Sequence, residues 1–512
     1  MDAPFAALAE TMLRPAPIAA IFWCLAATAA QATPSSSAGL QLLDRLTFGA
    51  STTTYAEFER LGFDHWLDQQ LRPPASDDLP ADAHAEIAAL LLSQQSLPDR
   101  VRVLDAERRF ADALIDPDQR QIARRNYQQQ LNNLAKEAAT RSLLRDLYSP
   151  DQLREVMTWF WLNQFSVHQG KANLRAMVGD YEDAIRAHAL GRFRDLVEST
   201  LRHPAMLRYL DNAENAVGHL NENYARELME LHTMGVGSGY TQKDVQELAR
   251  VLTGVGIDLK PEGPRVRPDR AADIVRDGVF EFNPNRHDYG DKTLLGHVIR
   301  GRGFAEVEEA LDILSRQPAT AQRVSQRLAQ YFVADDPPPA LVAAMAATFR
   351  RSDGDIAAVL RTMIRSDAFQ ASLGKKFKDP LQYALSAVRL AYGDRVILNT
   401  GPIQGWLARM GESPYGHETP DGYSLTSEAW DGPGQMALRF EVARQIGTGS
   451  AGLFRPLAGG ADAPAFPQLQ NALYFEALQG AISAQTGVTL SKAVSSGEWN
   501  TLFLASPEFM ER

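Results

Sequence analysis

The sequence is nearly free of cysteine. Its single cysteine among 512 residues, Cys24, lies in an apolar run near the start, so a chain cleaved after that run has no thiol. Disulfides, thiolate metal sites and cysteine nucleophiles are thereby excluded from the rest of the chain. Later apolar stretches never reach the length of about 18 uncharged residues that a membrane-spanning helix needs, so no internal span is expected.

The sequence is also poor in positive charge. It has 52 Lys and Arg against 63 Asp and Glu, a formal net charge of −11. A surface that binds nucleic acid needs clustered Lys and Arg to neutralise phosphates, so we expect no nucleic-acid partner. With 45% apolar and 22% charged residues, the composition is typical of a folded globular protein.

The start of the chain has the features of a signal peptide. An apolar run over 16–30 follows Arg14 and ends in the small-x-small triplet Ala30-Gln31-Ala32. Such a run is too short to span a bilayer comfortably. We therefore predict a signal peptide over 1–32 and export to the periplasm or the extracellular space. Acidic residues ahead of the run leave an uncleaved anchor as the alternative.

Helical periodicity dominates the remainder of the chain. It predicts a mostly α, bundle-like single large domain over 33–512. Residues 83–145 predict a long helical hairpin, and aromatic residues on all sides of 153–167 predict a buried helix. Within the domain we expect lobes at 38–150, 151–335 and 336–512.

Two departures from helix are expected. Segments 279–282 and 293–295 flank a run of turn residues, which predicts a small β-hairpin. Residues 411–434 are rich in Gly and Pro and predict a long irregular loop, of a kind that often has a function when it is ordered.

The run 221–233 contains the first candidate site. At 100° per residue, one helical face holds four polar side chains, Asn223, Arg226, Glu227 and Glu230. Two carboxylates one turn apart can divide acid and base roles, and they can also hold a cation. The alternative is an ordinary surface ion pair between Arg226 and Glu230, with Glu227 simply solvated.

A second helix is expected to begin at Thr241, after a Gly-rich turn. Its Asp244 stands at the capping-box position, and the turn brings it back toward His232 in the last turn of the first helix. Asp244 is thus a third acid/base candidate, and His232 is a candidate for substrate binding. The alternative is that both residues serve only the helix ends.

Two loops add further candidates for substrate binding. The loop 283–292 concentrates His287, Asp288 and Lys292, and the loop 414–423 contributes His417 among aromatic and polar neighbours. Irregular loops are where ligand contacts are often built. Hydrogen-bonded turns explain both segments nearly as well.

Several ordered blocks carry a family resemblance. They include Leu43-Asp44-Arg45-Leu46-Thr47-Phe48-Gly49, Phe160-Trp161-Leu162-Asn163-Gln164-Phe165, His203-Pro204-Ala205-Met206, the run 221–236, His287-Asp288-Tyr289-Gly290, the run 417–423, and Leu504-Ala505-Ser506-Pro507-Glu508-Phe509. Over nearly all of its length after the predicted signal peptide, the chain resembles the bacterial family called domain of unknown function 1800.

The resemblance implies an exported, largely helical protein, often encoded beside a secreted family that is similar to alkaline phosphatases and sulfatases. It implies no reaction. In many members a histidine stands at the position of Gln164, so a role built on that histidine does not carry over to this chain.

Three functions stay open from the sequence. The first is a hydrolase that acts on an envelope or environmental polymer such as a glycan, with Glu227, Glu230 or Asp244 as acid and base. The second is a non-catalytic binding or assembly protein, partnered by the secreted phosphatase-like neighbour. The third is a divalent-cation site, for which the spacing of the acidic residues is not diagnostic. All three assume that the acidic helix and the two loops gather around one solvent-accessible hollow.

Overall fold

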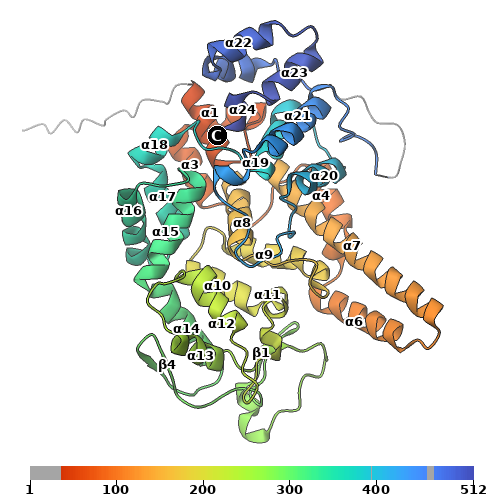
Figure 1. The fold of residues 1–512 in the computed structure, drawn as a ribbon, viewed down its shortest axis with the longest axis vertical. Helices are drawn as coiled ribbons and strands as arrows, with labels where there is room; N and C mark the ends of the chain where they lie inside the picture. Colours follow the sequence, from red (N-terminus) through yellow and green to blue (C-terminus); the bar gives the residue numbers. More distant parts are fainter. Residues whose placement is uncertain (1–35, 394, 458–465) are drawn as a thin grey trace, which may run out of the picture. The chain divides into compact units, whose positions relative to one another are not determined.

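The structure is a computed structural model that describes residues 36–393, 395–457 and 466–512. The predicted signal peptide lies outside these residues. Helices hold 62% of the chain and strands 4%, which confirms the mostly α prediction (Figure 1). Among the described residues, no helix combines the length and the apolar character that crossing a membrane requires.

Between residue 36 and the aromatic block, the structure has seven helices. Gly62, with a positive φ of 74°, separates the second from the third. Asp116 caps the seventh helix by accepting the amides of Asp118 and Gln119, and this helix packs along the sixth as the predicted hairpin (Figure 1). The helices are α1 (Ser36–Leu46), α2 (Thr52–Leu61), α3 (Phe63–Leu71), α4 (Ala81–Ala89), α5 (Leu91–Gln94), α6 (Leu97–Ala113) and α7 (Pro117–Tyr148).

The aromatic helix α8 (Gln152–Gln164) lies in the core. Every residue of it except Leu162 is buried, as expected for a helix that is apolar on all sides. It packs against α1, α3, α7 and α9 (Val178–His188). Its buried Glu155 pairs with Arg186 of α9, so this charge is compensated inside the protein.

The middle of the chain contains short helices and two small sheets. The helices are η1 (Leu174–Ala176), α10 (Phe193–Arg202), α11 (Pro204–Tyr209), η2 (Asn212–Glu214), α12 (Asn223–Glu227), η3 (Leu228–Thr233), α13 (Gln242–Val251) and η4 (Pro268–Asp273). The strands are β1 (Val255–Ile257), β2 (Val275–Asp277), β3 (Phe280–Phe282), β4 (Lys292–Leu294) and β5 (His297–Ile299).

The strand pairing corrects the predicted β-hairpin. β3 is the central strand between β1 and β2, and β4 pairs only with β5, so segments 279–282 and 293–295 are not partners. The turns explain this pairing. Gly278 at φ 60° and the Leu295–Gly296 pair at φ 50° and 81° form tight turns, so β2 pairs with β3 and β4 pairs with β5.

The rest of the chain is again helical around the predicted irregular loop. The helices are α14 (Ala305–Arg316), α15 (Pro318–Phe332), α16 (Pro339–Arg351), α17 (Ile356–Ile364), α18 (Asp367–Ser372), α19 (Pro380–Tyr392), α20 (Gly401–Met410), η5 (Ser427–Ala429), α21 (Pro433–Gly447), η6 (Tyr474–Leu478), η7 (Gln479–Ala481), α22 (Ala484–Ser491), α23 (Ser496–Leu504) and α24 (Pro507–Met510). The described residues cluster into one compact unit, and the three lobes stay a prediction.

Candidate functional site

The acidic helix is not uniform. α12 ends at Glu227, and η3 continues it as a π-helix in which the amide of Met234 donates to the carbonyl of Met229, five residues back, at 2.9 Å. The hydroxyl of Thr233 donates to the Leu228 carbonyl, also five residues back, at 2.6 Å. Short π turns inside helices are rare and occur frequently at functional sites. The π-helix therefore begins directly after Glu227, the strongest acidic candidate.

Glu227 is the one predicted carboxylate that stays unengaged. It is half-buried and has no hydrogen bond or ion pair among the described residues. Burial is the largest cause that raises the pKa of Glu227, and the carboxylate of Glu230 raises it further. Asp421, from the irregular loop, adds to the same effect, while Arg226 partly offsets it. A carboxyl group in such surroundings is suited to holding a proton for transfer.

Glu230 is held by its neighbours. Arg226 donates to Glu230 at 3.4 Å, to Glu222 at 3.2 Å and to Gln242 at 2.8 Å. Burial and a hydrogen bond to Glu230 raise the pKa of Tyr240 to about 12. The expected ion pair between Arg226 and Glu230 is therefore present, and Glu230 is less available for proton transfer than Glu227.

Asn223 fastens the start of the same helix. Its side-chain amide donates to the Leu210 carbonyl at 3.2 Å, and its backbone amide donates to Asn221 Oδ1 at 3.0 Å. The residue thus joins α12 to the chain that follows α11. These two hydrogen bonds hold the start of the helix that carries Glu227 in place.

The loop after α20 is tied to α8. Asn163 accepts the amide of Tyr423 at 2.6 Å and donates to its carbonyl at 2.9 Å. Gly422 has φ 75°, and a Cβ there would lie 2.1 Å from the Asn163 carbonyl oxygen, so only glycine fits. The Tyr415 hydroxyl donates to the buried carboxylate of Glu182. These bonds fix the segment that presents His417 and Asp421.

His417 and Asp421 lie on the outer side of this loop. The side chain of His417 is 25% exposed and that of Asp421 is 62% exposed. The His417 ring packs against Tyr423 at 4.7 Å, and its Nδ1 lies 2.9 Å from the Thr419 carbonyl. Tyr209 of α11 donates to the Glu418 carbonyl at 2.8 Å. Burial raises the pKa of Tyr209 to about 12, with Asp421 and Glu227 adding to it, so this tyrosine lies near both carboxylates.

Two arginines that sequence reasoning missed border the same place. Gln164, at the end of α8, donates to the Leu231 carbonyl at 2.5 Å and accepts from Nε of Arg327 at 2.9 Å. Arg323 lies one turn earlier on α15, against Gly235, where a Cβ would meet its Cδ at 3.4 Å. In the sequence both residues have the spacing of an ordinary helix surface, so no motif distinguishes them.

His232 corrects a prediction. It is fully buried, its ring packs against Phe165 at 5.1 Å and Tyr224 at 6.4 Å, and neither nitrogen has a hydrogen-bond partner in the described structure. Burial lowers the pKa of His232 to about 3, so the ring is neutral. A side chain without exposed surface cannot contact a substrate in this conformation, and none of the contacts of Asp244 reaches it.

The contacts of Asp244 also differ from those expected of an acid/base residue. Its carboxylate accepts the amide and hydroxyl of Thr241 at 2.8 and 2.6 Å, and the amide of Leu295 at 2.8 Å. Although burial alone raises it, these hydrogen bonds hold the pKa of Asp244 below its ordinary value. Both oxygens accept hydrogen bonds that cap α13 and link it to the β4–β5 turn, and the lowered pKa makes Asp244 a poor proton donor.

Two residues of the loop 283–292, His287 and Lys292, belong to a buried charge network. The side chains of His287, Lys292 and Glu306 have 0% exposure. Glu306 accepts from Nε2 of His287 at 2.9 Å and from Nζ of Lys292. The predicted substrate contacts of His287 and Lys292 are therefore corrected, because these groups have their partners inside the protein.

Asp288 is part of the same arrangement. It accepts from Nε of Arg250 at 2.8 Å and from the amide of Gly290 at 2.8 Å. Within the described ranges, no hydrogen bond or ion pair of the block 287–292 reaches Glu227, Glu230 or His417. The expected gathering of three polar segments thus reduces to two, the acidic helix and the loop with His417.

A divalent-cation site finds no support in this arrangement. No group of three or more His, Cys, Asp or Glu side chains placed to hold a metal ion occurs among the residues that the structure describes. Asp244 and Asp288 have hydrogen-bond partners of their own, and His232 is fully buried.

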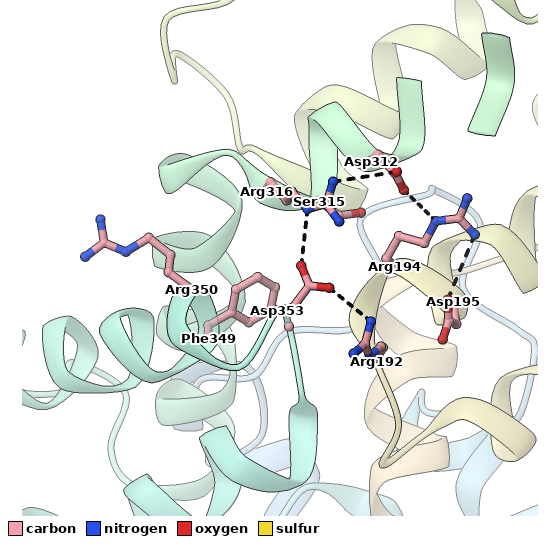
Figure 2. Close-up of a pocket in the computed structure, with 10 residues that line it drawn as sticks. Arg192, Arg194, Asp195, Asp312, Ser315, Arg316, Phe349, Arg350 and Asp353 are labelled. Carbon is pink, nitrogen blue, oxygen red and sulfur yellow. Dashed lines mark hydrogen bonds and ion pairs between the residues drawn. The ribbon is translucent and has the colours of Figure 1, made fainter. Parts of the chain in front are cut away.

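Two of the clefts on the surface of the described residues are lined by several charged side chains. One of about 680 Å³ is lined by Lys171 and Asp211, which flank Tyr209. The other, of about 460 Å³, contains closed ion pairs (Figure 2). There Asp353 joins Arg192 at 3.0 Å and Arg316 at 3.2 Å. This second cleft therefore has little uncompensated charge.

Fold and site together define a mostly α-helical protein in which an unpaired, half-buried glutamate faces an anchored loop. Residues 41–511 match the family model described as "Protein of unknown function (DUF1800)", and the chain belongs to this family. Neither a curated protein nor a solved structure matches the chain.

Proposed function

We propose that the protein is an exported hydrolase that cleaves an envelope or environmental polymer, such as a glycan, with Glu227 as the general acid. The observation that carries the proposal is the state of this carboxyl group: it has no hydrogen-bond or ion-pair partner within the described residues, and burial and neighbouring carboxylates raise its pKa. A protonated Glu227 donates its proton to the leaving oxygen as the bond to that oxygen breaks.

Asp421 is the second carboxylate of the proposed pair. It is exposed, and it acts electrostatically on Glu227. In the proposed reaction it accepts a proton from a water molecule, and the resulting hydroxide joins the carbon that the leaving oxygen has left. One water is consumed, and solvent returns the proton from Asp421 to Glu227. Two carboxylates in these roles are the usual machinery of glycoside hydrolysis.

A polymer is supported by the open cleft beside Tyr209. Lys171 donates to the Tyr209 carbonyl and to Asp211 at the edge of that cleft, while the Tyr209 hydroxyl reaches the Glu418 carbonyl. Lys171, which lines the cleft, thus contacts the residue whose hydroxyl reaches the loop that carries Asp421.

The test compares Glu227→Gln with a matched control. Purified protein is assayed for the release of reducing ends from a panel of polysaccharides. We expect Glu227→Gln to lower kcat by about 10²- to 10⁴-fold on the substrate found, as removal of a general acid does. Glu222→Gln, on the residue next to the same helix, whose carboxylate contacts Arg226 and Gln242, should change kcat by less than about threefold. Full activity of Glu227→Gln refutes the assignment.

The second candidate is a non-catalytic assembly protein partnered by a secreted phosphatase-like protein. It is favoured by the extent of internal ion pairing, as in the closed network around Glu306. In that case Glu227 is a structural group, and Glu227→Gln melts several degrees lower with no activity to lose. A catalytic carboxylate is instead neutralised with little loss of stability.

A further inference from the structure

Arg323 and Arg327 lack the partners that most buried charges have. They stand four residues apart on one face of α15, and both side chains are partly exposed. Among the described residues, neither guanidinium forms an ion pair with a carboxylate. Arg323 makes no hydrogen bond there at all, and its Nε is buried without an acceptor. Arg327 gives only its Nε, to Gln164.

Two partly buried cations without counter-charges destabilise the protein when no ligand is bound. Removing a cation from water without a counter-charge is unfavourable. Burial lowers the pKa of Arg327 to about 10, and the charge of Arg323 contributes in the same direction. The offsetting influence of Asp421 is small enough that the two positive charges stay largely uncompensated. An anion that enters between them recovers the lost interaction.

The position of the pair makes this anion part of the substrate. Gln164 connects Arg327 to the carbonyl of Leu231 in η3, and Arg323 lies against Gly235 just after η3. Asp421 acts electrostatically on both Arg327 and Glu227. The arginines therefore lie beside the proposed reaction site and not on a remote surface.

We propose that Arg323 and Arg327 bind an oxyanion of the polymer, a carboxylate or a sulfate ester, so that the substrate is an acidic polysaccharide. The inference rests on the proposed function and names its substrate class. The planar guanidinium fork matches the geometry of both anions, which an ammonium does not. The Nη atoms of both residues have no acceptor among the residues that the structure describes, so they are available for such paired hydrogen bonds.

The cleft in Figure 2 offers the matched control. Its Arg350 is also free of ion pairs within the described residues, but it is exposed and points away from the neighbouring pairs (Figure 2). Arg350→Gln removes one positive charge from the surface without touching α15. A loss of binding that is due only to net charge will appear in this variant too.

The experiment measures binding by isothermal titration calorimetry with the full-length protein. The probes are oligogalacturonate, its fully methyl-esterified form, and a sulfated galactan oligosaccharide with its desulfated form. We expect at least one anionic probe to bind about 10- to 100-fold tighter than its neutral counterpart, the contribution of one or two charge-assisted hydrogen bonds. The carboxylate and sulfate arms identify which oxyanion is recognised.

The variants decide whether the arginines are responsible. Arg323→Gln/Arg327→Gln should abolish the preference for the anionic probe, Arg327→Lys should keep part of it, and Arg350→Gln should keep all of it. Circular dichroism and melting temperature verify that each variant is folded; Arg323→Gln should melt no lower than the unaltered protein, because it removes a charge that has no partner. Equal binding of anionic and neutral probes, no binding of either anionic probe, or a preference that survives the double variant overturns the inference.

The two proposals fail in different ways. If Glu227→Gln stays fully active but the arginine variants lose the preference for the anion, the catalytic assignment falls and the recognition site stands. If Glu227→Gln binds the anionic probe normally but does not cleave it, while Arg323→Gln/Arg327→Gln keeps the preference for the anionic probe, the acid stands and the arginine recognition site falls.

Discussion

Lys292→Met tests whether the block around residue 287 is architecture. Lys292 and Glu306 have fully buried side chains that contact each other, and Glu306 also accepts from His287 Nε2 at 2.9 Å and from the amides of Arg302 and Gly303 at 2.6 and 2.9 Å. Removing one partner of a buried ion pair costs about 3–5 kcal/mol, because the remaining charge is left uncompensated. Since Glu306 keeps three donors, we expect the lower end, about 3 kcal/mol, for Lys292→Met.

Glu306→Gln should cost more than Lys292→Met. The ammonium of Lys292 then has no carboxylate partner among the described residues and depends on uncharged acceptors such as the carbonyl of Asp288. In Lys292→Met/Glu306→Gln both charges are gone, so the double variant should be about 1–3 kcal/mol more stable than the sum of the single effects implies. Urea unfolding followed by circular dichroism gives the three free energies, and equal slopes m verify that the unfolded states are comparable.

The pH dependence of Glu306 provides an independent arm. Although burial alone raises it, hydrogen bonds from His287 and Lys292 hold the pKa of Glu306 below its ordinary value. A lowered folded-state pKa stabilises the protein above the unfolded value of about 4.3, and this contribution is lost as the pH falls through the folded-state pKa. The gap between the unaltered protein and Glu306→Gln should therefore shrink below about pH 4. Single effects under about 1 kcal/mol, or a strictly additive double variant, refute the architectural interpretation.

Three further predictions concern the proposed site and its support. His232→Leu removes two buried nitrogens that have no partner among the described residues, so the free energy of unfolding at pH 7 should rise by about 1 kcal/mol. Burial lowers the folded-state pKa of His232 from 6.5 to about 3, so between pH 7 and pH 5 the unaltered protein should lose about 2 kcal/mol more stability than this variant, as measured by urea unfolding. Glu227→Gln should melt higher than the unaltered protein at pH 7 and equally at pH 4, because a raised folded-state pKa makes the charged carboxylate a cost that disappears below the unfolded value; a variant that melts lower at pH 7 contradicts the assigned environment. Gly422→Ala places a Cβ against Asn163 and should weaken the loop by about 1–2 kcal/mol or more, seen as faster amide exchange over 411–432 with the rest of the chain unchanged.

Much of the helical architecture could be predicted from the sequence, because long apolar periodicity survives in almost any tertiary context. The aromatic helix is an example: rings on all sides of α8 leave burial as the only solution. The predicted β-hairpin paired the wrong segments, because strands of three residues carry too little sequence pattern to indicate which strands pair. There the left-handed turn at Gly278 decided the pairing.

The site was harder to predict. Polar density in the sequence singles out the acidic helix and the loop with His417 as candidates, and their roles stay a prediction; Asp421 was not among the candidates. Glu306 was missed, since an acid in the first turn of α14 has an ordinary explanation at the helix N-terminus. Arg323 and Arg327 were missed for a similar reason: what distinguishes them is the lack of a partner, and a missing contact leaves no trace in the order of residues.

The π-helix beside Glu227 affects how this chain can be compared with its relatives. A π turn accommodates one residue more than an α-helix of the same rise, so a relative without it should lack one residue in this segment. An alignment that treats 223–233 as plain helix will then pair side chains that point about 100° apart. The residue of a relative that corresponds to Glu227 should be identified from superposed structures, by its position relative to the following turn. In a sequence alignment, a gap of one residue inside this helix indicates a relative that lacks the π turn.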